Sequence, residues 1–319
     1  MYKKIVIAHR GASGYLPEHT AEAKVLAHSF NVDYIEQDVV LSKDDIPIIL
    51  HDIYLDDVSD VATKFPELKR QDGHFYVVDF TLSQLKSLNL FERFSPITKK
   101  AIYPNRFPTQ YGDFKISSLK EEIELIRGLN KSRNLNIGLY TELKRVDFHK
   151  SQGKDITKIV IQMLESYGYK GKEDNFYIQC FDFDELKRIR THFKSQAKLI
   201  LLLEEPHINT STQDATNTNY TYLMSPQGLT EASQYINGIG PHYSLTYLKQ
   251  NSHLIATPLV DLAHQLNLNI HIYTARKEDL PPQFNTLEDF LKFLYFDIKV
   301  DGVFCDFPDI AMNVSKDKQ

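Results

Sequence analysis

The sequence predicts an α/β protein that forms a closed (β/α)8 barrel of the TIM type, with a small inserted subdomain after the second strand. Three observations lead to this prediction. Short apolar runs alternate with longer stretches of helical period almost to the C-terminus. The alternation repeats about eight times, which favours a closed barrel over an open doubly wound sheet, the remaining alternative. The apolar runs are rich in Val, Ile and Leu, as in parallel strands that are buried on both faces.

The expected strands are short, and several of them end in polar residues. We expect strands at residues 4–8, 34–41 with 47–50, 137–142, 176–180, 198–203, 236–240, 269–274 and 302–305. Residues 34–41 form one strand, and residues 42–46 form a turn before the run at 47–50. The carboxyl ends of these strands are where a parallel barrel carries its active site.

The stretches of helical period lie between these runs. We expect helices at residues 20–30, 119–129, 156–167, 183–193, 229–235, 258–266 and 287–298. Some of them carry recognisable start signals. Thr257 stands directly before Pro258, and Ser117 and Ser118 are followed by Glu121, as in a capping box.

Residues 52–115 interrupt the alternation. They contain no clean strand–helix unit, and Pro96, Pro104 and Pro108 stand among several Phe and Tyr residues. We expect one helix near residues 82–88 and a small separate core. The predicted organisation is a single domain over residues 1–319 with an insertion at about residues 52–115. Long insertions in compact folds are usually functional or flexible.

Composition excludes several classes of protein. The chain has 319 residues, 37 Lys and Arg against 42 Asp and Glu, and a formal net charge of −5. This balance argues against a nucleic-acid partner, which requires a basic face. No apolar run approaches the ~18 residues of a membrane span, so we expect no stable membrane insertion. The two cysteines, Cys180 and Cys305, are too few for a disulfide framework.

Three carboxylates are candidate ligands of a metal ion. Glu36 and Asp38 are two residues apart, which places both on one face of a strand, and Glu142 ends another strand. Gathering three such charges without a cation would cost several kcal/mol per ion. An all-oxygen set suits Mg²⁺ or Ca²⁺ better than Zn²⁺. The alternative is that Glu36 and Asp38 face solvent on an edge strand, which the apolar flanking residues Ile35 and Val39 argue against.

Two histidines and two basic residues follow the same strands. His9 and His51 each stand at the end of an apolar run and form the natural pair for proton transfer, because imidazole titrates near neutral pH. Arg10 and Lys144 add positive charge beside the carboxylates. A guanidinium or an ammonium group there suits a phosphate, although ordinary salt bridges to the carboxylates are the alternative.

Seven short motifs together resemble one family. They are HRGASGYLPEHT at residues 9–20, EQD at 36–38, HD at 51–52, TELK at 141–144, QCFD at 179–182, GIGP at 238–241 and DFPD at 306–309. This set closely resembles the bacterial glycerophosphodiester phosphodiesterases, most of all their larger, periplasmic-type members, across essentially the whole chain. One departure is His19, where the common family motif has Asn.

The resemblance implies a fold, a reaction and a role for each candidate residue. It implies a (β/α)8 barrel with an insertion after the second strand. It also implies hydrolysis of deacylated phospholipids, such as glycerophosphocholine and glycerophosphoethanolamine, to sn-glycerol 3-phosphate and an alcohol. The implied roles are general acid and base for His9 and His51, binding of one Ca²⁺ or Mg²⁺ for Glu36, Asp38 and Glu142, and phosphate contact for Arg10 and Lys144.

Some alternatives remain open at this point. A related barrel phosphodiesterase of the lysophospholipase D type would act on intact lysophospholipids, and a non-catalytic binding protein could keep the fold. The sequence does not separate a cyclic phosphate intermediate from direct attack by water, and it leaves the head group and oligomeric state open. The first residues contain no signal-peptide core, so we expect a periplasmic protein if a leader was trimmed and a cytoplasmic one if the chain is complete.

Overall fold

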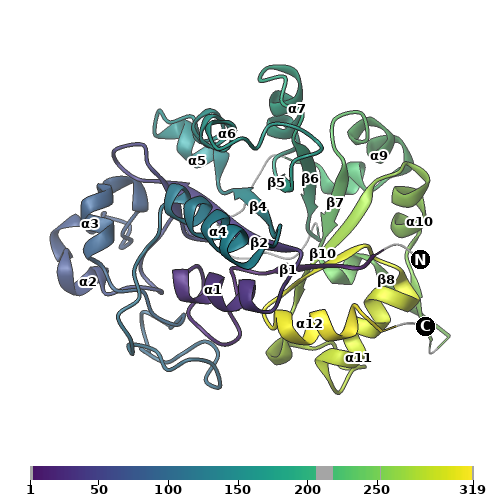
Figure 1. Ribbon diagram of the computed structural model, residues 1–319, viewed down its shortest axis with the longest axis horizontal. Helices are drawn as coiled ribbons and strands as arrows, with labels where there is room; N and C mark the ends of the chain where they lie inside the picture. Colours follow the sequence, from purple (N-terminus) through teal and green to yellow (C-terminus); the bar gives the residue numbers. More distant parts are fainter. Residues whose placement is uncertain (1–2, 206–217, 252, 318–319) are drawn as a thin grey trace.

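The computed structural model describes residues 3–205, 218–251 and 253–317. Within these residues, eight parallel strands form a closed barrel (Figure 1). They are β1 (Ile5–Ala8), β2 (Tyr34–Leu41), β4 (Gly138–Leu143), β5 (Phe176–Cys180), β6 (Lys198–Leu203), β7 (Gly238–Pro241), β10 (Asn269–Ala275) and β11 (Gly302–Cys305). Each strand pairs with its neighbours along the chain, and β1 pairs with both β11 and β2, which closes the ring. The predicted barrel is therefore confirmed.

Helices surround this ring of strands. They are α1 (Ala21–Ser29), α4 (Leu119–Arg133), α5 (Val146–Ser151), α6 (Ile156–Ser166), α7 (Phe183–Thr191), α8 (Tyr220–Leu223), α9 (Pro226–Ala232), α10 (Pro258–Gln265), α11 (Leu287–Lys292) and α12 (Pro308–Val314). Ser118 caps α4 through a capping box with Glu121, as its sequence predicts. Pro258 occupies the first turn of α10. The stretch predicted at 287–298 is α11 followed by a π-helical turn over Phe293–Ile298.

Some elements differ from the prediction. β7 lies at Gly238–Pro241 instead of residues 236–240, and the hairpin of β8 (Tyr247–Gln250) and β9 (His253–Ala256) was not predicted. The hairpin is largely exposed or half-buried, so its residues form no continuous apolar run that could have indicated a strand. Among the described helices, none combines the length and the apolar composition needed to cross a membrane.

The inside of the barrel is filled by large side chains. Tyr140 and Tyr177 stack with their ring centroids 4.8 Å apart, and the Tyr140 hydroxyl lies 2.8 Å from Nδ1 of the buried His271. Phe304 on β11 packs edge-on against Tyr140. Because Phe304 also lines the cavity at the carboxyl end of the barrel, this packed interior forms the floor of that cavity.

The segment between the antiparallel strand β3 (Pro47–Ile49) and α4 has an apolar cluster of its own. It contains the short helices α2 (Val61–Lys64) and α3 (Leu82–Ser87), and the latter confirms the helix predicted near residues 82–88. Its buried residues, among them Phe75 and Phe80, pack with Val40 and Ile48 of β2 and β3. Figure 1 shows α2 and α3 to one side of the barrel. This cluster fixes the segment against the strands that carry the candidate site.

Candidate active site

A cavity of about 280 Å³ opens at the carboxyl ends of the strands. All seven residues that the sequence analysis selected contribute to its lining: His9, Arg10, Glu36, Asp38, His51, Glu142 and Lys144. They come from the end of β1, from within β2, from the end of β4 and from the loop that follows β3. The fold thus brings together side chains that are up to 135 positions apart in the chain.

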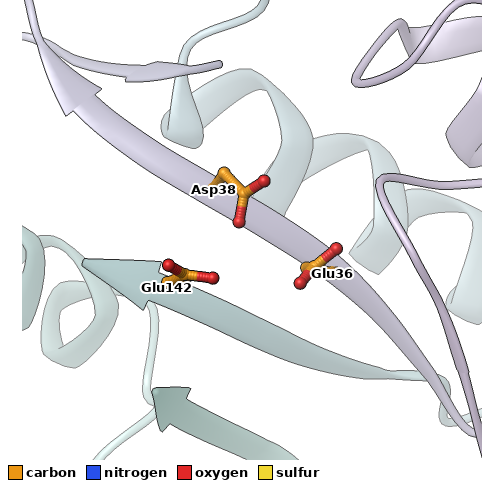
Figure 2. A group of neighbouring side chains, drawn as sticks. All are labelled: Glu36, Asp38 and Glu142. Carbon is orange, nitrogen blue, oxygen red and sulfur yellow. The ribbon is translucent and has the colours of Figure 1, made fainter. Parts of the chain in front are cut away.

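Three of these residues form an acidic cluster on two adjacent strands. Glu36 and Asp38 lie on β2, and Glu142 lies on β4, directly opposite Asp38 in the parallel register. One carboxylate oxygen from each lies within 4.8 Å of the others, and all three residues are buried (Figure 2). Since β2 is an inner strand paired with β1 and β4, the alternative of a solvent-facing edge strand is wrong.

Glu36 and Asp38 have different hydrogen-bond partners, and their pKa values shift in opposite directions. Glu36 accepts hydrogen bonds from the backbone N–H of Arg10 at 2.8 Å and from the side chain of Gln179 at 3.0 Å. Burial, together with the adjacent Asp38 charge, raises the pKa of Glu36 to about 8. Burial would also raise the pKa of Asp38, but the interaction with His19, 2.8 Å away, and the positive charge of Lys144 hold the Asp38 pKa well below its usual value.

The composition of the cluster fits a hard divalent cation. Its donors are carboxylate oxygens only, the set that Ca²⁺ and Mg²⁺ prefer. Oδ1 of Asp38 is buried and has no hydrogen-bond partner among the described residues. A buried acceptor without a partner is costly, and so is the repulsion between the carboxylates. A bound cation would relieve both.

His9 is held by a carboxylate on the side away from the cluster. Its Nδ1 lies 2.5 Å from Oδ1 of Asp306, which follows β11. Its Nε2 lies 3.8 Å from Oε2 of Glu36. Burial lowers the pKa of His9 to about 4, although the Asp306 charge opposes this shift. The imidazole therefore presents Nε2 to the acidic cluster.

His51 has the same arrangement. Its Nδ1 contacts Oδ1 of Asp52, and its Nε2 lies 3.3 Å from Nζ of Lys144. Lys144 in turn forms an ion pair with Glu142, at 2.8 Å. Because an ionised carboxylate only accepts hydrogen bonds, Asp52 and Asp306 each fix a proton on Nδ1 of their histidine. Both Nε2 atoms are then left for chemistry in the cavity.

Arg10 depends on an unusual turn after β1. Its own φ is 56°, and Gly11 has a φ of 91°. A Cβ at position 11 would lie 2.9 Å from the backbone of Ala23, so the turn requires glycine. The turn directs the Arg10 backbone N–H to Glu36 and its guanidinium to Glu18, at 2.9 Å. Packing therefore explains the glycine at position 11, and charge explains the arginine at position 10.

Three polar residues of this region had no role predicted from the sequence. Gln179 and Arg276 line the cavity, and Asp306 holds His9 from behind. All three stand at or just after the end of a strand, and that position was the available signal. Their position in the sequence could not show which of these side chains faces the cavity and which pairs with a histidine.

Glu92, in the segment between β3 and α4, provides a test of the electrostatics near the site. It is buried, and burial with the nearby Glu18 charge raises its pKa to about 8. A raised carboxyl pKa contributes stability that is full below the usual value of 4.5 and is lost as the pH rises through about 8. We expect Glu92→Gln to reduce the loss of unfolding free energy between pH 5 and pH 8 by about 2–3 kcal/mol. Urea unfolding at both pH values measures this, and equal losses in the two proteins would contradict it.

Fold and site together define a TIM-barrel enzyme whose carboxyl end combines an acidic cluster, two imidazoles and several cationic side chains. The profile of the Glycerophosphoryl diester phosphodiesterase family matches residues 9–310. The chain belongs to this family. It is therefore a phosphoric diester hydrolase, as its sequence predicts.

The chain is similar to curated family members over nearly its whole length. It is 40% identical to the glycerophosphodiester phosphodiesterase of Haemophilus influenzae, covering 98% of this chain and 90% of that protein. It is 36% identical to the glycerophosphodiester phosphodiesterase of Treponema pallidum, covering 97% and 91%.

Solved structures support the fold. An Oleispira antarctica phosphodiesterase in complex with the product sn-glycerol-3-phosphate matches with a TM-score of 0.64 at 20% identity, covering 99% of this chain and 98% of that one. A glycerophosphodiester phosphodiesterase of Thermotoga maritima matches with a TM-score of 0.59 at 19% identity, covering 98% and 99%. At these identities the likeness is one of fold.

Proposed function

We propose that this protein hydrolyses glycerophosphodiesters, such as glycerophosphocholine and glycerophosphoethanolamine, to sn-glycerol 3-phosphate and an alcohol, with the help of a divalent cation. The observation that carries the proposal is the convergence of three carboxylates, two imidazoles and two basic side chains on one cavity of about 280 Å³. The names of the curated relatives and the product bound to the Oleispira antarctica enzyme support the same substrate class.

The proposed binding groups are the charged residues of β2, β4 and the turn after β1. Glu36, Asp38 and Glu142 would hold one Ca²⁺ or Mg²⁺ ion. When bound, such an ion supplies positive charge that stabilises the phosphoryl oxygens and lowers the pKa of a nearby hydroxyl group. Arg10 and Lys144 would contact the phosphate, since their cationic ends lie beside the acidic cluster.

The proposed proton-transfer groups are His9 and His51. Each imidazole has its Nδ1 bonded to a carboxylate and its Nε2 on the side of the cavity residues. One histidine would remove the proton of the attacking oxygen, and the other would donate a proton to the departing alcohol oxygen. The attacking oxygen is either the glycerol hydroxyl next to the ester, giving a cyclic phosphate that water opens, or water itself. Both routes use the same pair of imidazoles.

The test is an assay of glycerol 3-phosphate release from glycerophosphocholine. We expect activity in the untreated protein, loss of activity with a chelator, and recovery when Ca²⁺ or Mg²⁺ is restored. Lysophosphatidylcholine serves as the parallel substrate, and release of choline, which both substrates would give, measures its turnover. Turnover of lysophosphatidylcholine with none of glycerophosphocholine would contradict the substrate class, and full activity in the chelator would contradict the role of the cation.

A further inference from the structure

Both candidate catalytic histidines are connected to an arginine through a carboxylate. Asp306 contacts His9 with Oδ1, and its Oδ2 accepts a hydrogen bond from Nη2 of Arg106 at 2.6 Å. Asp52 contacts His51 with Oδ1, and its Oδ2 accepts a hydrogen bond from Nη1 of Arg93 at 2.6 Å. In both connections, therefore, the carboxylate binds the histidine Nδ1 with Oδ1 and an arginine with Oδ2, although the residues come from different parts of the chain.

The Arg106 side chain is buried and is held by several contacts. Its side chain is 5% exposed, and its guanidinium forms two hydrogen bonds with Glu278, at 2.8 and 3.0 Å. The guanidinium carbon lies 3.9 Å from the centre of the Tyr103 ring. Arg276 also approaches Oδ2 of Asp306, at 3.4 Å. Arg106 thus holds the carboxylate in one orientation from a rigid position.

Arg93 is held in a similar way by acidic residues. It forms hydrogen bonds with Oε1 of Glu18 at 2.7 Å and with Oε2 at 3.3 Å, and it contacts Asp57 through the same Nη1 that binds Asp52. Its side chain is 17% exposed. Glu18 also binds Arg10, so this network continues to a residue that lines the cavity.

Both arginines come from the segment between β3 and α4, and neither is among the described residues that line the cavity. Asp52 begins this segment, directly after His51, whereas Asp306 follows β11. Arg93 and Arg106 therefore reach the two histidines from behind, through these carboxylates, without lining the cavity where a substrate would lie.

We propose that the segment at residues 52–115 positions the two imidazoles, with Arg106 acting on His9 through Asp306 and Arg93 acting on His51 through Asp52. Arg93 and Arg106 are positioning residues in this proposal. The inference rests on the proposed roles of His9 and His51. A misplacement of a reacting group by about 1 Å can cost 10²-fold in rate, so an arginine that fixes the carboxylate behind an imidazole affects turnover without touching the substrate.

The experiment compares single and double variants in the glycerol 3-phosphate release assay. We expect Arg106→Gln and Arg93→Gln each to lower kcat by about 10-fold or more, with KM changed less than about 2-fold. If each arginine acts through its carboxylate, the effects within a connection are not additive. Arg106→Gln combined with Asp306→Asn should then be no slower than Asp306→Asn alone, and the same holds for Arg93 and Asp52.

Arg70 provides the matched control. It lies in the same segment, forms two hydrogen bonds with Asp79 at 2.7 and 2.8 Å, and packs its guanidinium 4.0 Å from the centre of the Tyr76 ring, but contacts neither histidine nor Asp52 or Asp306. Arg70→Gln should keep kcat while removing an arginine–aspartate ion pair from the same segment. Circular dichroism and thermal unfolding show which variants are folded.

Three outcomes would overturn the proposal: kcat in Arg106→Gln and Arg93→Gln no lower than in Arg70→Gln, additive effects within each connection, or a rise in KM with kcat unchanged. If a Gln variant does not fold, Arg106→Lys and Arg93→Lys replace it. They keep the positive charge but lose the planar guanidinium with its paired donors, so we expect them to lower kcat by a smaller factor. Failure of the proposed function is distinguishable, because the wild-type protein itself would then release no glycerol 3-phosphate. Failure of the proposed roles of His9 and His51 is also distinguishable, because His9→Ala and His51→Ala would then retain turnover.

Discussion

Replacing His9 with alanine is expected to lower the turnover of glycerophosphocholine by about 10²–10⁴-fold, and His51→Ala is expected to have an effect of the same size. Each imidazole has its Nδ1 bonded to a carboxylate and its Nε2 beside the cavity residues, so its removal takes away a group that would transfer a proton. The measurement is kcat for glycerol 3-phosphate release. Added imidazole should restore part of the activity of each variant.

The His9→Ala variant should still fold, which makes its activity informative. The Asp306 carboxylate keeps its contacts with Arg106 and Arg276 when the imidazole is absent, so no buried charge is left alone. His192, exposed just after α7, provides a control, and His192→Ala should keep wild-type turnover. A His9→Ala or His51→Ala protein with a near-normal rate would remove that histidine from the mechanism.

Asp38→Asn is expected to lower turnover by at least about 10³-fold and to abolish stabilisation by Ca²⁺ or Mg²⁺. The metal would supply several kcal/mol of charge stabilisation in the transition state, and each 1.4 kcal/mol is about tenfold in rate. The change is nearly isosteric, and the amide oxygen can still accept the hydrogen bond that His19 makes to Oδ2. Thermal unfolding with and without the ion measures binding independently of activity. The wild-type protein should gain about 2.7 kcal/mol at an ion concentration of 100 times Kd.

A carboxylate outside the cluster provides the control for this variant. Asp184 is exposed on α7 and pairs with Lys187, and Asp184→Asn should change neither the rate nor the ion-dependent stability. An Asp38→Asn protein that is still stabilised by the ion as strongly as the wild type would show that the ion binds elsewhere. In that case the acidic cluster would need another explanation.

The sequence by itself determined the barrel, its eight strands and the seven candidate site residues. The physical reason is that strands buried on both faces require continuous apolar runs, which stand out in the sequence, and several of these runs end in polar residues. Glu36 and Asp38 could be placed on one face because successive side chains of a strand alternate, and β2 confirms this. The exposed hairpin of β8 and β9 has no such run and could not be predicted in this way.

Only the tertiary structure decided how the histidines are held. The connections from Arg106 through Asp306 to His9, and from Arg93 through Asp52 to His51, join the segment at residues 52–115 to the ends of β1, β3 and β11. No periodicity in the chain records such contacts, because they depend on how an irregular segment packs against the barrel and not on the local repeat of a helix or strand. Hydrogen bonds between residues as far apart as 9 and 306 are set when the ring of strands closes, so the positioning of the imidazoles is a property of the closed barrel.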